Sequence, residues 1–374
     1  MDPYRGPVVT NRADDACPGA LRVHQAADGA LARVRLPGGM ITSAQLAVLA
    51  GVSSRFGSGT LELTARGNVQ IRGITDTAAV AQALAGAQLL PSATHERVRN
   101  IVASPLSGRV GGLTDVRGFV AELDEAIQGK PTLAALPGRF WFSVDDGRGD
   151  VSGLAADVAL HFSDDAVALL LAGRDTGVRL AASEGVAALV SVAERFTEMR
   201  EKAWRVAELR QPEALLPGIE LSDTPFHAVL RPPVGWIKQD DGRIALGAAV
   251  PLGVLTAQVA DYLAAIEAPL VITPWRSVLV CDLYEATADA ALRVLAPLGL
   301  VFDENSPWLS VSACTGSPGC ARSVADVRAD AAQSLSTAAG GHRHFVGCER
   351  ACGSPPAGEV LVATGDGYRL LRSS

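Results

Sequence analysis

Four of the six cysteines form two pairs in glycine-containing stretches, Cys314-x5-Cys320 and Cys348-x3-Cys352, with 27 residues between the pairs. Four thiolates suit either a tetrahedral zinc ion or a [4Fe-4S] cluster. Zinc ribbons typically use two tight C-x2-C knuckles, and neither pair has that spacing. The pattern therefore favours a [4Fe-4S] cluster with these four ligands. A zinc ion and four unrelated buried thiols are the alternatives.

The residues around the two pairs also favour a cluster. Glycines let backbone N–H groups approach the sulfur atoms, and they occur beside both pairs: Gly316, Gly319, Gly347 and Gly353. Residues 321–335 place apolar side chains at helical spacing, which predicts a helix that starts directly after Cys320. An anionic cluster would be favoured at the N-terminus of such a helix.

Composition restricts the possible partners and compartment. The chain has 374 residues and a formal net charge of −7, which argues against nucleic acid as the main partner. Its first 19 residues carry acids and prolines instead of the apolar core of a signal peptide, so we expect no export and a cytoplasmic protein. The apolar runs are too short to span a membrane, so no membrane partner is expected. Cytoplasmic cysteines are rarely paired in disulfides, which leaves ligand or core roles for them.

A self-comparison shows an internal repeat. Residues 36–74 and 250–283 each contain a Pro-x-Gly turn, a helix entry with threonine, an apolar-periodic helix and a strand that begins Leu-x-Leu/Ile-Thr. A β-α-β unit therefore occurs twice, which suggests duplication within one chain. Because two such units can complete a pseudo-dimer internally, we expect a monomer.

Strand and helix patterns alternate along the whole chain, so the predicted class is mixed α/β (α+β). One of the longer predicted helices runs from about residue 187 to 209. We divide the chain into a half domain, a mixed α/β domain, a second half domain and a cluster-binding α/β domain: residues 1–80, 81–220, 221–284 and 285–374.

The cysteine pattern C-x5-C followed by G-C-x3-C resembles the cluster signature of the sirohaem-dependent nitrite and sulfite reductase superfamily. The duplicated unit is similar to that family's ferredoxin-like half domains, so the resemblance covers nearly the whole chain. It implies a [4Fe-4S] cluster held by the four cysteines. In reductases of this family the cysteine that matches Cys352 also bridges to the sirohaem iron.

The resemblance also implies which residues bind the macrocycle, whose carboxylates require guanidinium partners. The stretch "LTARGNVQIRG" resembles the family's T-x-R-x-x-x-Q pattern, and on a strand Thr64, Arg66 and Gln70 would share one face. The second copy has Trp275 and Leu279 at the positions of Arg66 and Gln70, so a single active site is expected. The predicted contacts are Arg66, Gln70, Arg97, Arg99, Asn100 and Arg139. Arginines that merely solvate a sheet face are the alternative.

One stretch departs from the reductase pattern. In "LPGRFWFSVDD", Arg139 and Trp141 occupy positions where nitrite and sulfite reductases carry two cations. Reduction of these anions needs positive charge and a proton supply at the developing oxyanions. A neutral co-substrate such as O2 has no such need.

These features, together with the opening "ACPGALRVHQ", resemble the precorrin-3B synthase family, the cobalamin-pathway branch of the superfamily. The resemblance implies a monooxygenase that hydroxylates precorrin-3A at C20 with O2 and closes a γ-lactone. It also implies that electrons come from NADH or a reduced carrier. The alternatives are a sirohaem-dependent nitrite or sulfite reductase and a cluster-bearing electron-transfer or scaffold protein without a tetrapyrrole site.

Other residues receive weaker interpretations. His342 and His344 would share a face on a strand and could bind an additional non-haem iron, which the resemblance to the synthase family implies. Two histidines without a third ligand favour a solvated loop instead, so no mononuclear metal ligand is assigned. Cys281 is predicted to be a core residue, and Cys17 a turn residue that could lie near the substrate. Residues 145–150, with three aspartates, are predicted to form a hairpin turn.

Overall fold

The computed structural model describes residues 17–373 except 220, 223, 225, 228, 230 and 338–340. The N-terminal residues that predicted the absence of a signal peptide therefore lie largely outside the described part. The chain folds as two compact units. The first unit contains residues 17–19, 35–39 and 91–229, and the second contains residues 20–34, 40–90 and 230–373. The second unit thus includes most of three of the four predicted segments.

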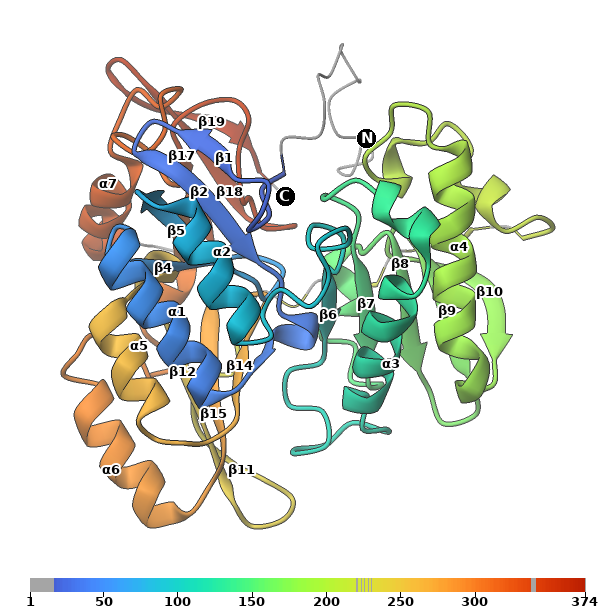
Figure 1. The fold of residues 1–374 in the computed structure, drawn as a ribbon, viewed down its shortest axis with the longest axis horizontal. Helices are drawn as coiled ribbons and strands as arrows, with labels where there is room; N and C mark the ends of the chain where they lie inside the picture. Colours follow the sequence, from blue (N-terminus) through green and yellow to red (C-terminus); the bar gives the residue numbers. More distant parts are fainter. Residues whose placement is uncertain are drawn as a thin grey trace. The chain divides into compact units, whose positions relative to one another are not determined.

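The second unit holds most of copy 1 of the predicted repeat (residues 24–86, of which 35–39 belong to the first unit) and copy 2 (residues 235–295). Each copy builds an antiparallel sheet (Figure 1). The sheet of copy 1 has the order β1-β2-β5-β4-β13: His24–Ala26, Gly29–Val34, Val69–Ile74, Thr60–Leu63 and Val254–Thr256. The sheet of copy 2 has the order β11-β12-β15-β14-β3: Gly235–Lys238, Ile244–Ala249, Ser277–Leu283, Leu270–Ile272 and Met40–Ile41.

The two copies exchange their short strands. β13 belongs to copy 2 in sequence but pairs with β4 of copy 1, where Leu255 is opposite Leu61. β3 belongs to copy 1 but pairs with β14 of copy 2, where Ile41 is opposite Leu270. Each sheet is therefore completed by the other copy, as expected for an internal pseudo-dimer.

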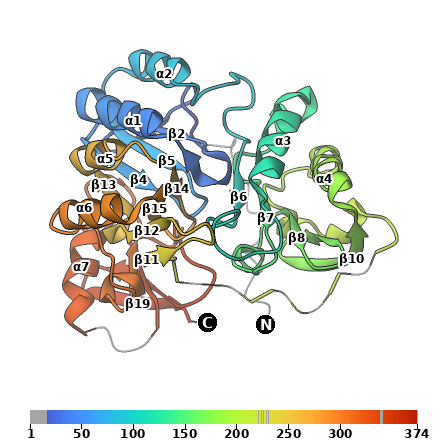
Figure 2. The ribbon, with the colours of Figure 1, turned by 90° about the horizontal axis from the view of Figure 1, so that it is seen from below.

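Helices cover one side of these sheets (Figure 2). They are α1 (Ser43–Phe56), α2 (Thr77–Gly86), α5 (Ala257–Ala264) and α6 (Glu285–Leu295). The repeated threonines begin the equivalent helices: Thr42 caps α1 through a capping box with Gln45, and Thr256 caps α5 by accepting from Val259 N. α1 and α5 then pack against each other.

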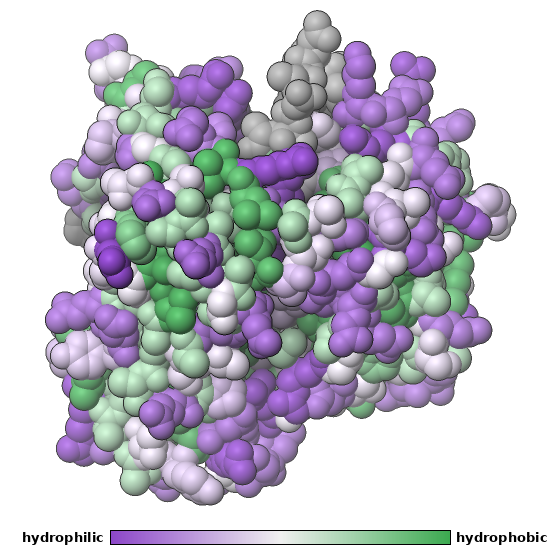
Figure 3. Space-filling view, viewed as in Figure 1, coloured by the Kyte–Doolittle hydropathy of each residue, from purple (hydrophilic) through white to green (hydrophobic). Residues whose placement is uncertain are grey.

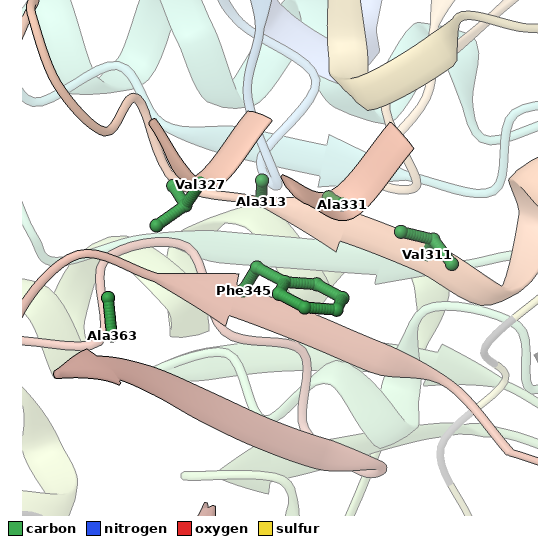
Figure 4. Packing of buried hydrophobic residues seen from close by; sticks show 6 residues of the cluster. All are labelled: Val311, Ala313, Val327, Ala331, Phe345 and Ala363. Carbon is green, nitrogen blue, oxygen red and sulfur yellow. The ribbon is translucent and has the colours of Figure 1, made fainter. Parts of the chain in front are cut away.

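The C-terminal part of the second unit, residues 311–372, is called the cysteine module here. Its sheet has the order β16 (Val311–Ala313), β17 (Arg343–Val346), β18 (Glu359–Thr364) and β19 (Gly367–Arg372). The first three strands are parallel, and β19 is antiparallel to β18. Helix α7 (Val327–Gln333) packs Val327 and Ala331 onto this sheet, where they meet Val311, Ala313 and Phe345 (Figure 4).

The helix predicted for residues 321–335 is wrong at its start, because α7 begins only at Val327. Asp326 caps it by accepting from Ala329 N. The preceding residues fold as turns instead, with Ser323 N donating to Cys320 O and Ser317 N donating to Ala325 O. The N-terminus of α7 is thus not adjacent to Cys320 in sequence.

The first unit has a mixed sheet of order β10-β9-β8-β7-β6, covered by α3 and α4. The strands are Arg174–Leu180, Val167–Leu171, Val158–Phe162, Phe142–Asp145 and Ile101–Ala103, and the helices are Arg117–Gln128 and Gly185–Met199. The predicted helix 187–209 is too long, since α4 ends at Met199. Beyond it, Arg205 turns toward the sheet and donates to both carboxylate oxygens of Asp157, at 2.7 and 2.9 Å.

The mixed α/β class predicted from the sequence is confirmed. On the face seen in Figure 3, hydrophilic residues are interspersed with apolar ones. Within the part of the chain that the structure describes, no helix is both long and apolar enough to cross a membrane.

Candidate functional site

The cysteine pairs lie at one edge of the cysteine module. Cys314 follows β16 and Cys348 follows β17 by one residue, and these two strands are parallel neighbours. The carboxyl ends of parallel strands meet at the same sheet edge, so the loops that carry the two pairs start side by side. Two bonds join the loops: Cys314 N donates to Phe345 O at 2.9 Å, and Gly347 N donates to Cys314 Sγ at 3.4 Å.

The four thiols also interact electrostatically. Burial raises the pKa of Cys352, and the negative charges of Cys314, Cys348 and Cys320 raise it further. Among the described residues, three potential metal ligands have their ligand atoms within 4.8 Å of one another, and these are Asp145, Asp146 and Asp150. The four cysteines do not form such a group among the described residues.

Glycines are needed where the loops pack closely. Gly316 has a φ of +71°, and a Cβ there would lie 2.8 Å from Cγ2 of Val327. A Cβ at Gly347 would collide with the hydroxyl of Ser323. These glycines keep the two cysteine loops against α7 and against each other, and this arrangement together with four thiols fits a group held by four thiolates.

An open hollow of about 470 Å³ borders this site. It is lined by Arg322, Cys348, Glu349 and Arg350. Cys348 is half-buried, and Cys352 is exposed as a residue although its thiol is partly shielded from water, so this side of the cysteine loops faces solvent within the second unit. The burial pattern is uneven across the four thiols, because Cys314 is packed against the apolar side chains of β17 and β18.

His342 and His344 have a hydrogen-bonding role in the cysteine module. Ser312 Oγ lies 2.7 Å from both His342 Nε2 and His344 Nδ1. His344 Nε2 donates to the carbonyl of Cys352 at 3.0 Å. Burial lowers the pKa of His344 to about 3, so this imidazole is neutral. The solvated-loop interpretation is therefore wrong for His344, which is fully buried on β17.

The predicted polar face of copy 1 is a hairpin rather than one continuous strand. Residues 64–68 form the turn between β4 and β5, so Arg66 lies in a turn. Thr64 closes this turn, because its hydroxyl accepts from Asn68 N at 3.1 Å and from Arg66 N at 3.4 Å. Such side-chain bonds to the backbone are the usual reason for threonine at a turn. Thr64 therefore has a structural role in its turn. Thr273, the equivalent residue of copy 2, has the same role, because its hydroxyl accepts from Trp275 N and Ser277 N.

Gln70 lies on β5 in a buried polar row. Its Oε1 accepts from Arg33 Nη2 at 2.6 Å, and its Nε2 donates to Glu62 Oε2 at 2.7 Å. Glu62 also accepts from Arg328 Nη2 of α7 at 2.5 Å. Sequence reasoning missed Arg33, Glu62 and Arg328. Strand register would have found the first two, since both are directly opposite Gln70 in the sheet.

Arg97 and Asn100 lie together in the first unit. Asn100 Nδ2 donates to the carbonyls of Arg97, Gly138 and Phe140 at 3.0–3.1 Å. Cys17 joins this group, because its thiol donates to Gly138 O at 3.2 Å and its carbonyl accepts from Arg97 Nη1 at 3.5 Å. The thiol of Cys17 therefore lies among the predicted substrate contacts of this unit.

Arg99 and Arg139 have different surroundings. Arg99 is buried and makes a bidentate ion pair with Asp124 of α3, at 2.6 and 2.7 Å. The charge of Arg99 is thus balanced by Asp124 within the first unit. Arg139 is exposed, and its guanidinium lies 5.4 Å from the ring centre of Trp204. The structure brings Arg97 and Asn100 together but gives Arg99 an internal partner on a helix.

Trp141 is a core residue of the first unit. Its side chain is 4% exposed, and the guanidinium of Arg205 lies 5.8 Å from its ring centre. Asp157 holds both, because it accepts from Trp141 N at 3.0 Å and pairs with Arg205 at 2.7 Å. The position thus carries an aromatic side chain packed beneath an arginine.

The hairpin predicted for residues 145–150 is wrong, because β7 and β8 are parallel and need a crossover connection. The Asp145 carboxylate organises this loop by accepting from backbone N–H groups: Gly147, Gly149, Val151 and Ser152. Burial, together with the charge of Asp145, raises the pKa of Asp150 to about 7. Cys281, by contrast, is fully buried in β15 as predicted.

Residues 24–87, which span copy 1, match the family model "Nitrite/Sulfite reductase ferredoxin-like half domain". The chain is similar to the Mycobacterium tuberculosis NirA protein, with a TM-score of 0.75 over 92% of this chain and 76% of that one, at 21% identity. The chain has the predicted nitrite/sulfite reductase-like fold.

Sequence relatives divide between two kinds of enzyme. A precorrin-3B synthase from a Sinorhizobium species is 28% identical, over 97% of this chain and 83% of the relative. A ferredoxin–nitrite reductase from Leptolyngbya laminosa is 36% identical over 117 residues, which are 29% of this chain and 23% of the relative. The predicted resemblance to precorrin-3B synthase, within the nitrite and sulfite reductase superfamily, is confirmed over nearly the whole chain.

Proposed function

We propose that the chain is an oxidoreductase of tetrapyrrole metabolism, a precorrin-3B synthase of cobalamin biosynthesis. The observation that carries this proposal is the similarity to a precorrin-3B synthase over 97% of the chain, whereas the matched nitrite reductase segment covers 29%. The substrate is precorrin-3A. One oxygen atom of O2 forms a new bond to C20, the other leaves as water after uptake of two electrons and two protons, and a γ-lactone closes.

In this proposal Cys314, Cys320, Cys348 and Cys352 hold a [4Fe-4S] cluster. Their electrostatic proximity and the N–H···S bond from Gly347 support this role. The sequence spacing argues against zinc, since neither cysteine pair is a C-x2-C knuckle of the zinc-ribbon type. When bound, the cluster would pass single electrons from NADH or a reduced carrier toward the reaction. No additional iron ligand is assigned.

The proposed substrate contacts are Arg66, Gln70, Arg97, Asn100 and Arg139. Guanidinium groups would pair with the acetate and propionate carboxylates, and the amide of Gln70 is already oriented by Arg33 and Glu62. Arg99 stays among the proposed substrate contacts, and its guanidinium also pairs with Asp124 within the protein.

Trp141 supports O2 rather than an anion as co-substrate. A buried indole offers no positive charge to nitrite or sulfite, and the nearby Arg205 is paired with Asp157. The sirohaem reductase is the second candidate, because a ferredoxin–nitrite reductase is 36% identical to this chain over 117 residues. These two functions differ in cofactor content and can be separated directly.

The test uses the full-length protein purified without oxygen. We expect about four irons and four sulfides per chain, a broad absorbance near 400 nm and no extractable haem. Incubation with precorrin-3A, NADH, a reductase and isotopically labelled O2 should add one labelled oxygen atom to the product. Stoichiometric sirohaem with viologen-driven nitrite or sulfite reduction would overturn the proposal, as would a colourless zinc protein.

A variant links the cluster to the reaction. Cys348→Ser should lose most of the absorbance near 400 nm and the oxygen incorporation together, because one ligand is removed. Cys281→Ser is the matched control, since Cys281 is a core thiol of β15. It should keep both properties. Retained activity in Cys348→Ser without a cluster would contradict the electron-transfer role.

A further inference from the structure

We infer that Arg72 and Arg276, one from each half-domain copy, are positioning residues that hold the two cysteine loops in place around the cluster. The inference rests on the proposed [4Fe-4S] cluster. Each guanidinium binds the carbonyl of a glycine that adjoins a ligand cysteine in sequence: Gly319 before Cys320, and Gly353 after Cys352.

Arg72 reaches the first loop from β5 of copy 1. Its Nη2 donates to Gly319 O at 2.6 Å, and the same guanidinium is fixed by two bonds of 2.8 Å to the carboxylate of Asp28. Glu62 lies 3.9 Å away on the neighbouring strand. Arg72 is 7% exposed, so its direction is set by these partners. Copy 1 thus supplies a rigid, charged anchor for the loop of Cys320.

Arg276 reaches the second loop from the turn between β14 and β15 of copy 2. Its Nη2 donates to Gly353 O at 2.7 Å. A Cβ added at Gly353 would lie 2.5 Å from that nitrogen, so the glycine makes room for the guanidinium. Arg276 has a φ of +58°, a left-handed conformation that is unfavourable for a residue with a side chain. An arginine is thus present at a position where glycine would adopt the backbone conformation without steric cost.

Besides their hydrogen bonds to the glycine carbonyls, both guanidiniums interact with cysteine thiolates through charge. Burial works to lower the pKa of Arg72, yet its bond to Asp28 and the charges of Glu62 and Cys320 together raise it. Burial and the charge of Arg328 lower the pKa of Arg276, and the charges of Glu62 and Cys314 oppose that shift. A positive charge near a cluster stabilises its reduced, more negative form, so both arginines should raise the reduction potential.

The experiment compares full-length wild type with Arg276→Gln, Arg276→Lys and Arg72→Lys after identical cluster reconstitution. Three properties are measured: iron and sulfide content, the rate of cluster loss to a chelator, and the midpoint potential in a dithionite titration followed by EPR. Arg293→Gln is the control, because this exposed arginine of α6 forms an ion pair with Asp289, four residues before it on the same helix.

Arg276→Gln should lose its cluster about tenfold faster, as expected for removal of one charge-assisted hydrogen bond. Its midpoint potential should shift to more negative values, and Arg276→Lys should return the potential toward that of wild type because the charge is kept. Arg72→Lys should lose the cluster faster with little change in potential. A purely structural role would leave the potential of Arg276→Gln unchanged.

The outcomes separate this inference from the proposed function. Variants that bind a cluster with the content, decay rate and potential of wild type would overturn the positioning role alone. A wild-type protein that takes up no cluster under the same conditions would overturn both. If Arg72→Lys does not fold, the Arg276 variants decide the result by themselves, since Arg276 lies in a turn.

Discussion

The two half-domain copies pair their strands in the same way, but three equivalent positions carry polar side chains in copy 1 and no polar side chains in copy 2. In copy 1 the row across the sheet is Arg33, Gln70 and Glu62; in copy 2 the equivalent row is Gly247, Leu279 and Val271. The strand registers are identical, so the fold accepts either an apolar or a charged row. The charged row in copy 1 is therefore not required by the fold, which supports a functional reason for it.

A second difference concerns the left-handed positions. Copy 1 has glycines there, Gly38 with a φ of +63° and Gly67 with +65°. Copy 2 has Leu252 with +54° and Arg276 with +58° at the equivalent places. The duplicated backbone keeps its unusual dihedral angles even where the residue type is unfavourable. Conformation has been preserved more strictly than sequence.

The largest expected effect comes from breaking the charged row. Glu62→Ala leaves Arg328 and Gln70 without their acceptor, and loss of one partner from a buried ionic network costs about 3–5 kcal/mol. The equivalent change in copy 2, Val271→Ala, removes only apolar contacts and should cost about 2 kcal/mol. Urea unfolding at pH 7 measures both. Equal losses would contradict the distinction between the copies.

A smaller effect is expected at the turns. Arg66→Ala should weaken precorrin-3A binding about tenfold or more, because one guanidinium–carboxylate pair is lost. Trp275→Ala, at the equivalent turn of copy 2, should leave the dissociation constant unchanged. Anaerobic fluorescence or absorbance titration checks this, with the cluster spectrum as a control for folding. Equal binding by wild type and Arg66→Ala would place the carboxylate contacts elsewhere.

Replacing a residue of copy 1 by its counterpart sharpens the comparison further. Gln70→Leu removes a donor from Glu62 and an acceptor from Arg33, which should lower the free energy of unfolding by about 1–3 kcal/mol. The apolar side chain fits the sheet, as Leu279 shows in copy 2. A stability gain in thermal unfolding would mean that the charged row carries no net stabilising hydrogen bond at this position.

The smallest effects concern backbone conformation. Gly67→Ala should destabilise the protein by about 1 kcal/mol, because an L-residue is forced into a left-handed conformation. Arg276→Gly should change the free energy of unfolding by less than about 1 kcal/mol, since relief of the left-handed strain offsets the greater flexibility of the unfolded chain and the lost bond to Gly353 O. Differential scanning calorimetry distinguishes the two. A large loss in Arg276→Gly would make this arginine a general structural residue.

The repeat and its threonines could be predicted because local patterns determine them. Thr42 and Thr256 cap the equivalent helices, as their positions before apolar-periodic runs indicate. The helix at 321–335 was predicted too long because apolar spacing alone does not show where Asp326 caps the chain. Strand β19 was missed altogether, since its pattern of exposed Leu370 and Leu371 does not alternate.

The candidate site was only partly predictable. The proposed cluster ligands could be predicted from cysteine spacing, because each pair lies within one short loop. Arg72 could not be found in this way, since its partner Gly319 is 247 residues away along the chain. Arg99 has the residue type of a substrate contact but pairs with Asp124 on a helix, and only three-dimensional structure shows such a pairing.

The exchanged strands β3 and β13 limit how this chain could evolve. Each copy donates the edge strand that closes the other's sheet. A gene fragment that encodes copy 1 alone would produce a sheet whose β4 edge has unpaired backbone groups, a surface prone to association with other strands. Once the duplicated halves had come to close each other's edges, neither could be lost or moved to another protein without its partner. The half domain is thus a unit of ancestry and no longer a unit of folding.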